Sequence, residues 1–380
     1  MQLATRLVHV VFAGGGTGGH LFPGLAVAGC LIARTPNVRV TFAGTGRPLE
    51  VRHVAAAGFD YLGLRCRPLP KRLRQFGQFL LENLAGYVVA ARFLAREQVS
   101  LVVGLGGYGS VPMARAAAAR HLPLVLLEQN AVPGRATRWL ARRASLVCTA
   151  FEQAHAYFPA GCRLRLTGNP IRSVEQPAAT FLQSSLKLAP PNTPRQLLVL
   201  GGSGGSHTLN ANVPKALHQI RGCLHGWRII HQSGLEDADR TRRLYADLNL
   251  PADVVPFIAD MAHTLPASHL AIARAGGTTL AELAAAGLPA ILVPYPHATD
   301  DHQRKNADIF AESGACVVLD EREPAGPMEH RLAHFLGPLL ADTRRRQAMA
   351  ASMRRLARPE AASTVAEAIR GLLAEARRAA

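Results

Sequence analysis

The chain has 380 residues, 48% of them hydrophobic, which is enough for two domains that each bury a core. Lys and Arg outnumber Asp and Glu by 43 to 26, and the formal charge of +17 favours polyanions such as phosphorylated substrates or anionic lipid. The six cysteines form no CxxC pair, which disfavours a zinc site or disulfide framework. Neither a signal peptide nor an apolar run of about 18 residues is found, so no membrane span is expected.

The first predicted elements are a strand, a glycine loop and a helix. An apolar run from Leu7 to Phe12 leads into Gly14–Gly19 and His20, and a helical pattern follows from Pro23 to Ile32. Glycines let a ligand approach the backbone, and a helix start suits phosphate. The GxGxxG match is weak because no acidic residue ends the second strand, and the missing Lys-Ser/Thr excludes a P-loop. His20 lies where it could reach a ligand; the alternative is a solvated first-turn histidine.

The rest of the chain alternates apolar runs with helical patterns, which indicates an α/β fold of two doubly wound domains with parallel sheets and a cleft between them. A Pro- and Ser-containing passage, 169–195, separates the two series. The expected strands are 38–43, 100–105, 122–127, 145–149 and 164–167, then 196–200, 227–231, 253–257, 269–273, 289–293 and 315–319. We predict domains at 1–173 and 174–357, with a helix from about 358 to 380 packing back on the first domain.

Four glycine clusters at predicted strand ends suggest a surface lined with backbone donors for several phosphates. They are Gly14–Gly19, Gly104–Gly109, Gly201–Gly205 and Gly276–Gly277. Ser203 is either a phosphate contact or a helix N-cap, and Glu282 is either a ribose contact or a first-turn charge favoured by the helix dipole. The DxD at Asp237–Asp239 lies in a charged helical stretch, so we interpret it as a solvated face.

Seven motifs, in this order, resemble the bacterial lipid I N-acetylglucosaminyltransferases of glycosyltransferase family 28. They are GGGTGGH (14–20), GGYGSVP (106–112), LEQN (127–130), GNPIR (168–172), GGSGGS (201–206), RAGGTTLAELAAAGLPAILVPYP (274–296) and DDHQRKNA (300–307). The resemblance implies the GT-B fold, two Rossmann-like domains facing across a cleft. It also implies inverting transfer of N-acetylglucosamine from UDP to the muramyl 4-hydroxyl of undecaprenyl-linked lipid I, which forms lipid II for peptidoglycan synthesis.

Carried over by position, the resemblance also implies the site residues. Ile258 would offer its backbone to uracil, Glu282 would contact the ribose, and Gln303 would contact a sugar hydroxyl. The donor set is Thr17, Gly18, Gly19, Asn130, Arg172, Ser203, Ile258, Gly277, Thr278, Thr279, Leu280, Ala281, Glu282, Gln303 and Asn306, and the acceptor set is Gly15, Gly16, Gly106, Gly107 and Tyr108.

The chemistry requires a base for the incoming hydroxyl and positive potential for the departing UDP. His20 is the first candidate for the catalytic base and Glu128 the second, and the resemblance does not decide between them. Helix starts and Arg172 would stabilise the leaving group, so neither a cofactor nor a tightly bound metal is expected.

Other functions remain open at this point. One is a GT-B UDP-sugar transferase for a diacylglycerol or small-molecule acceptor, and another is a non-hydrolysing UDP-sugar epimerase. A nucleic-acid-binding module would also account for the charge, although no nucleic-acid motif accompanies it.

A lipid-linked acceptor predicts a peripheral protein at the cytoplasmic face of the inner membrane. Basic and apolar residues lie together at 69–81, where we predict docking on anionic lipid. The docking residues are Lys71, Arg72, Arg74, Phe76, Phe79 and Leu80. For the longer stretch 65–96 the alternative is an ordinary buried helix, which we favour for its second half, from Tyr87 on.

Overall fold

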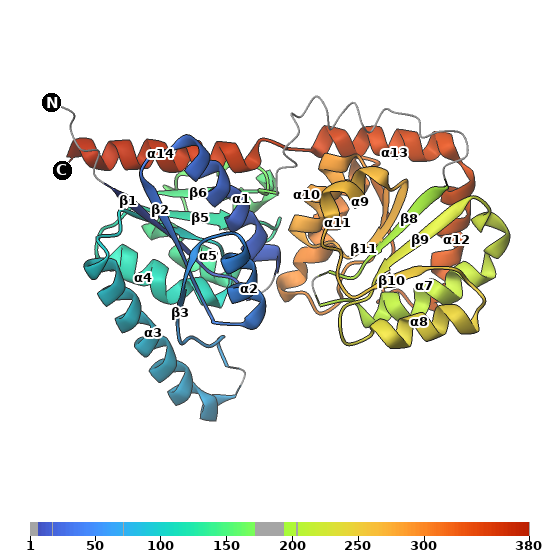
Figure 1. Ribbon diagram of the computed structural model, residues 1–380, viewed down its shortest axis with the longest axis horizontal. Helices are drawn as coiled ribbons and strands as arrows, with labels where there is room; N and C mark the ends of the chain where they lie inside the picture. Colours follow the sequence, from blue (N-terminus) through green and yellow to red (C-terminus); the bar gives the residue numbers. More distant parts are fainter. Residues whose placement is uncertain (1–6, 17, 71, 172–193, 203, 380) are drawn as a thin grey trace. The chain divides into compact units, whose positions relative to one another are not determined.

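Figure 1 shows a computed structural model, in which residues 7–16, 18–70, 72–171, 194–202 and 204–379 are described. The chain divides into two compact units. Unit 1 comprises Met1–Arg172 and Glu360–Ala380, and unit 2 comprises Ser173–Pro359.

Unit 1 is built on a parallel sheet with the strand order β3-β2-β1-β4-β5-β6-β7. The strands are β1 (Val8–Ala13), β2 (Val38–Gly44), β3 (Asp60–Gly63), β4 (Leu101–Gly104), β5 (Leu124–Glu128), β6 (Leu146–Thr149) and β7 (Leu164–Leu166). Its helices are α1 (Gly18–Arg34), α2 (Pro48–Ala56), α3 (Phe76–Arg96), α4 (Val111–Ala119), α5 (Arg135–Leu140) and α14 (Ala361–Ala379), with 3₁₀ turns η1 (Leu73–Gln75), η2 (Tyr108–Ser110), η3 (Ala141–Arg143) and η4 (Glu152–Tyr157).

Strand β1 shows why the sheet of unit 1 needs cover on both faces. All six of its residues are buried. Val8, Val10 and Phe12 belong to one apolar cluster, while Val11 and Ala13 belong to another. Because successive side chains of a strand point to opposite faces, these two clusters lie on the two sides of the sheet.

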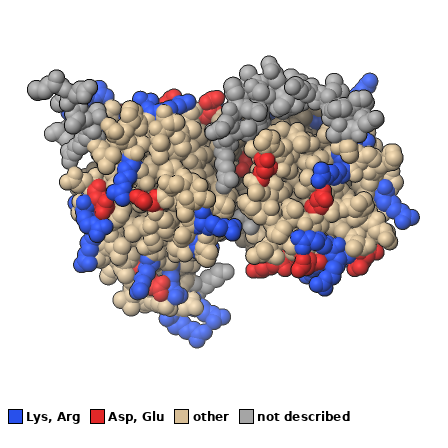
Figure 2. All heavy atoms as spheres, viewed as in Figure 1, with Lys and Arg blue, Asp and Glu red and all other residues tan. Residues whose placement is uncertain are grey.

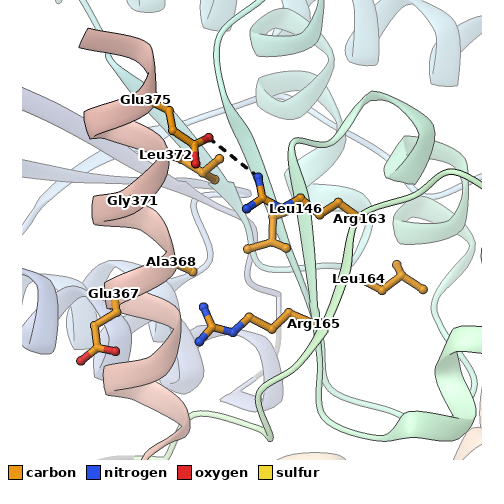
Figure 3. Close-up of a pocket in the computed structure, with 9 residues that line it drawn as sticks. All are labelled: Leu146, Arg163, Leu164, Arg165, Glu367, Ala368, Gly371, Leu372 and Glu375. Carbon is orange, nitrogen blue, oxygen red and sulfur yellow. Dashed lines mark ion pairs between the residues drawn. The ribbon is translucent and has the colours of Figure 1, made fainter. Parts of the chain in front are cut away.

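Helix α14 completes the first of these clusters, although it is the last element of the chain. It contributes apolar residues such as Val365, Ile369 and Leu372 to the core that contains β1 and β2. An ion pair of 2.9 Å joins Arg34 of α1 to Glu367 of α14. A cavity of about 260 Å³ lies between α14 and the β6–β7 edge. Its lining residues are drawn in Figure 3, where the dashed line joins Arg163 to Glu375, whose charged groups are 3.8 Å apart. None of the predicted site residues lines this cavity.

Unit 2 repeats the plan with the parallel strand order β10-β9-β8-β11-β12-β13. Its strands are β8 (Arg195–Leu200), β9 (Trp227–Gln232), β10 (Asp253–Val255), β11 (Leu270–Ala273), β12 (Ala290–Leu292) and β13 (Cys316–Val318). Its helices are α7 (His207–Gln219), α8 (Ala238–Asp247), α9 (Met261–Ala267), α10 (Gly277–Ala286), α11 (His302–Glu312), α12 (Met328–Ala341) and α13 (Thr343–Leu356), with η5 (Arg221–Leu224) and η6 (Thr299–Asp301).

The prediction of two doubly wound parallel sheets is confirmed, and each predicted strand overlaps an observed one. The short strand β3 was not predicted, because it lies at an edge and is mostly half-exposed, so it carries little apolar signal. Helix α1 begins at Gly18 and not near Pro23, which places His20 inside the first turn. In both sheets the strand order reverses beside the first strand of the unit, and ligands of such folds bind beyond the carboxyl ends at that position.

Two further expectations concern the membrane and the cysteines. None of the helices in the described part of the chain has the length and apolarity to cross a bilayer. The six cysteines are free thiols.

Candidate active site

In unit 1 the loops after β1 and β4 meet where the strand order reverses. Gly14, Gly15 and Gly16 have φ values of 129°, 150° and 86°, and Gly106 and Gly107 have 96° and 69°. A Cβ on Gly14 would lie 2.8 Å from the carbonyl oxygen of Gly106. All five positions therefore favour glycine for backbone conformation, and Gly14, Gly15 and Gly106 also lack space for a Cβ. Four of the five predicted acceptor residues come from these two loops.

His20 lies directly against the second of these loops. A Cβ on Gly106 would be 2.9 Å from Cδ2 and 3.3 Å from Nε2 of His20, and one on Gly107 would be 3.8 Å from Cε1. The ring is half-buried. The structure thus brings the predicted base together with the predicted acceptor loops, with the imidazole resting on glycine backbone.

Two residues that the sequence analysis missed hold the first loop. The carboxylate of Glu50, which is fully buried, accepts the backbone N–H of Gly16. Arg47 donates from one guanidinium nitrogen to the carbonyl of Gly16 (2.8 Å) and from the other to the hydroxyl of Tyr108 (3.0 Å). The signal available in the sequence was Pro48 followed two residues later by an acid, a pattern typical of a helix start, and Glu50 does lie in the first turn of α2.

Glu128, the second candidate base, ends β5 and is 4% exposed. Its carboxylate accepts the backbone N–H groups of Asn130 (3.1 Å) and Gly134 (3.0 Å), and it also accepts from the side chain of Asn130 (3.3 Å). Burial raises the pKa of Glu128, while these hydrogen bonds oppose that shift. The Glu128 carboxylate therefore holds the 130–134 loop.

In unit 2 the glycine loop after β8 rests on the segment after β9. A Cβ on Gly205 would lie 2.0 Å from the carbonyl oxygen of Ser233. Asn210 donates to the same carbonyl (2.8 Å), and its side-chain oxygen faces Nε2 of His231 (3.0 Å). Ser206 is the N-cap of α7, since its hydroxyl accepts the backbone N–H of Leu209 (3.3 Å).

Two predicted donor residues of α11 bind the loops at the ends of β11 and β12, and one of them, Gln303, joins the two loops. The side-chain oxygen of Gln303 accepts the backbone N–H groups of Ala275 (3.2 Å) and Tyr295 (3.0 Å). Asn306, which is fully buried, donates to the carbonyl of Ala275 (3.1 Å). Both residues therefore hold the segment that leads into α10.

Helix α10 carries the predicted donor residues Gly277–Glu282. The expected first-turn position of Glu282 is wrong, because α10 starts at Gly277 and Glu282 is its sixth residue. Its side chain is half-buried, and the favourable field of a helix N-terminus fades beyond the first turn. The helix dipole therefore does not account for a carboxylate at this position.

The other predicted site residues lie as follows. Thr17, Lys71, Arg172 and Ser203 lie outside the described residues. Gly18 and Gly19 begin α1, and Ile258 is buried in the loop after β10.

The predicted solvated face at the DxD holds for Asp239, which is exposed. Asp237 instead precedes α8 and accepts from Asn210 (3.0 Å). Among the described residues no cluster of His, Cys, Asp or Glu has the arrangement of a metal site.

Comparison with known proteins shows which class of enzyme the chain resembles. Residues 10–149 match the glycosyltransferase family 28 N-terminal domain, and residues 196–365 match the glycosyltransferase family 28 C-terminal domain. The fold is accordingly of the GT-B type. The crystal structure of Acinetobacter baumannii MurG aligns with a TM-score of 0.73 at 31% identity, covering 96% of this chain and 99% of that chain.

Two curated relatives show which members of this class the chain is similar to. A protein of Methylococcus capsulatus is 42% identical over 363 residues, 94% of this chain and 97% of the relative. A protein of Geobacter sulfurreducens is 37% identical over the same shares. Both are named UDP-N-acetylglucosamine–N-acetylmuramyl-(pentapeptide) pyrophosphoryl-undecaprenol N-acetylglucosamine transferase. The chain belongs to glycosyltransferase family 28.

The buried network beneath the unit 2 glycine loop predicts acid sensitivity. His231 is bonded to Asn210 and Tyr245, and burial lowers its pKa to about 3. As pH falls below about 6.5 the unfolded chain takes up a proton that the folded chain does not, so the free energy of unfolding should drop by about 2 kcal/mol between pH 6.5 and 5.

Urea unfolding at several pH values, followed by the fluorescence of buried Trp227 in a Trp139→Phe background, measures this slope. His231→Gln should reduce this slope, while His225→Gln, which alters an exposed histidine, should leave it unchanged. Equal slopes for the two variants would show that His231 does not cause the pH dependence.

Proposed function

We propose that the chain transfers N-acetylglucosamine from UDP-N-acetylglucosamine to the muramyl 4-hydroxyl of lipid I, with inversion, and so forms lipid II for peptidoglycan synthesis. The observation that carries this proposal is the match along 94% of the chain to relatives that bear one and the same transferase name. Because that match spans both units, the donor and acceptor halves of the reaction are both represented.

In the proposed reaction the 4-hydroxyl oxygen attacks C1 of the donor sugar, and the bond from C1 to the UDP oxygen breaks. The hydroxyl proton passes to a base on the protein, and UDP leaves with the electron pair. Backbone N–H groups at glycine loops and helix starts suit the developing charge on the diphosphate.

We assign the base to His20 in preference to Glu128. The His20 ring is half-buried and rests on the Gly106–Gly107 loop, so it faces the loops assigned to the acceptor. The Glu128 carboxylate is buried and accepts backbone hydrogen bonds on both oxygens, which commits it to its own loop. A base must come within hydrogen-bond reach of the hydroxyl proton, and His20 meets this condition better.

The assay that tests the function combines labelled UDP-N-acetylglucosamine with a short-chain lipid I analogue. Formation of the labelled disaccharide supports the proposal. Transfer to a diacylglycerol or a small acceptor instead, or conversion of the sugar nucleotide without any acceptor, would overturn it and identify the other transferase class or an epimerase.

Glu282→Ala should raise the KM for the donor about ten- to a hundredfold, because a charge-assisted hydrogen bond to the ribose is lost. Calorimetry with UDP measures the loss directly. Glu312→Ala, an exposed carboxylate at the end of α11, is the matched control. Unchanged UDP affinity in the Glu282 variant would reject the ribose contact.

His20→Ala should lower kcat by about 10²–10⁴-fold while UDP affinity stays near that of the parent. The physical reason is that the base acts on the acceptor hydroxyl and not on the nucleotide. Steady-state kinetics with both substrates, beside calorimetry, separates the two quantities. Near-normal turnover would remove His20 from the mechanism and promote Glu128.

A peripheral membrane position follows from the lipid-linked acceptor, and we assign docking to the start of α3. Leu73 is 94% exposed, and Phe76 and Leu80 are 44% and 52% exposed. Arg72 and Arg74 are exposed beside them. In Figure 1 α3 extends away from its sheet, and Figure 2 shows Lys and Arg side chains gathered at its far end. Basic residues near an anionic surface contribute about 1 kcal/mol each, and apolar insertion adds to this.

Replacing Lys71, Arg72, Arg74, Phe76 and Phe79 with Ser should release the protein from anionic liposomes and spare activity on a short-chain soluble acceptor. Co-sedimentation at several salt concentrations measures the binding, which should weaken as salt rises. A control with Leu235, Arg344 and Arg345 replaced by Ser alters exposed residues of unit 2. If the α3 variant sediments like the parent, docking lies elsewhere.

A further inference from the structure

Both sides of Gly16 are held by the segment that follows β2. Its N–H donates to Oε1 of Glu50, and its carbonyl accepts from Arg47 at 2.8 Å. Arg47 is the residue before α2, and Glu50 lies in the first turn of that helix. One short stretch of chain therefore holds the last described residue of the loop that precedes α1 and His20.

The carboxylate of Glu50 is saturated by donors. Oε1 accepts from Gly16 and from the hydroxyl of Thr45 (2.7 Å), and Oε2 accepts from the N–H of Gly46 (3.2 Å) and the hydroxyl of Tyr61. Each oxygen thus meets one backbone N–H. A backbone N–H cannot turn into an acceptor, so an amide in this place would set its NH₂ group against a donor whichever way it turned. The site requires a carboxylate.

The space around the Glu50 carboxylate is also restricted. A Cβ on Gly15 would lie 3.0 Å from Cδ of Glu50, and one on Gly44 would lie 2.7 Å from Oε2. Glycine is therefore required on both sides of the carboxylate, and the loop packs directly on it. The fully buried position of Glu50 makes this a fixed support and not a surface contact.

Arg47 extends the support to the other acceptor loop. Its second guanidinium nitrogen donates to the Tyr108 hydroxyl at 3.0 Å, so one side chain bridges the loop after β1 and the loop after β4. His20 lies against Gly106 and Gly107 of that second loop. The planar guanidinium can reach two acceptors at once, which an ammonium on a flexible stem does poorly.

We propose that Arg47 and Glu50 form a brace of positioning residues that fixes the two acceptor loops and the first turn of α1, and with it the His20 imidazole. This inference rests on the proposed function, in which those loops meet the acceptor and His20 takes its proton. A reacting group displaced by about 1 Å loses about a hundredfold in rate, so a support of this kind acts on catalysis without touching substrate.

The test uses the full-length protein with four variants. Glu50→Gln keeps the shape of the side chain but introduces the donor conflict. Arg47→Ala removes the bridge, and Arg47→Lys keeps the charge without the two-pronged geometry. Arg52→Ala, an exposed arginine on the same helix, is the matched control.

With the lipid I analogue, Glu50→Gln and both Arg47 variants should lose about tenfold or more in kcat/KM for the acceptor, while the donor KM and UDP affinity stay within about twofold. Arg52→Ala should match the parent. Lys restoring full activity at position 47 would overturn the bridge, because charge alone would then suffice. In the Arg47 variants, a loss of kcat in proportion to lost UDP-binding sites, with both KM values unchanged, would also overturn the brace, because the loss would then come from unfolded protein and not from a displaced base.

Hydrogen exchange supplies a measurement that does not depend on activity. Amides of the peptide covering residues 12–20 should exchange faster in Glu50→Gln and in Arg47→Ala than in Arg52→Ala. Unchanged exchange in both variants would overturn the brace even if the chain is a transferase. Failure of the parent protein to use the lipid I analogue, with exchange altered as expected, would instead overturn the proposed function and leave the brace in place. Because Arg47 is exposed, we expect its variants to fold. They therefore test the proposal even if Glu50→Gln does not fold.

Discussion

The backbones at the carboxyl ends of β1 and β4 approach so closely that a side chain cannot fit between them. A Cβ on Gly14 would come within 2.8 Å of the Gly106 carbonyl. The same constraint recurs in unit 2, where a Cβ on Gly205 would come within 2.0 Å of the Ser233 carbonyl. The contact in unit 1 lies where the strand order reverses, between β1 and β4, which is where folds of this kind bind their ligands, whereas the contact in unit 2 lies at the carboxyl ends of the consecutive strands β8 and β9. At Gly14 and Gly205 glycine is thus a packing requirement, whereas at Gly202 and Gly204 a Cβ would meet nothing within 4 Å.

Loops with so few side chains cannot hold themselves in place, and buried polar side chains from neighbouring elements do this for them. Glu50 holds the loop after β1, and Glu128 holds the loop after its own strand β5. In unit 2 Asn210 binds the carbonyl of Ser233, while Gln303 and Asn306 bind the backbone around Ala275. In each case a carboxylate or amide bonds to backbone N–H or C=O groups of the loop.

This arrangement explains why polar residues at strand ends are hard to interpret from a sequence. Glu128 was predicted as a candidate base, and Gln303 and Asn306 were predicted as donor contacts from the family resemblance. In the structure each is bonded to backbone. Holding a loop and contacting a ligand call for the same side-chain chemistry, so residue type alone does not separate the two roles.

The sequence by itself determined the two doubly wound sheets, their strands and the glycine loops at the strand ends, because burial and turn formation leave a local pattern of apolar runs and glycines. It placed His20 beside a glycine loop for the same reason. Only the tertiary structure decided which loop faces which side chain. Gly16 and Glu50 are 34 residues apart, Arg47 and Tyr108 are 61 apart, and β3 is a half-exposed edge strand with little apolar signal. Such partners are chosen by the strand order of the sheet, and hydrophobic periodicity reports that a residue is buried without reporting what it meets.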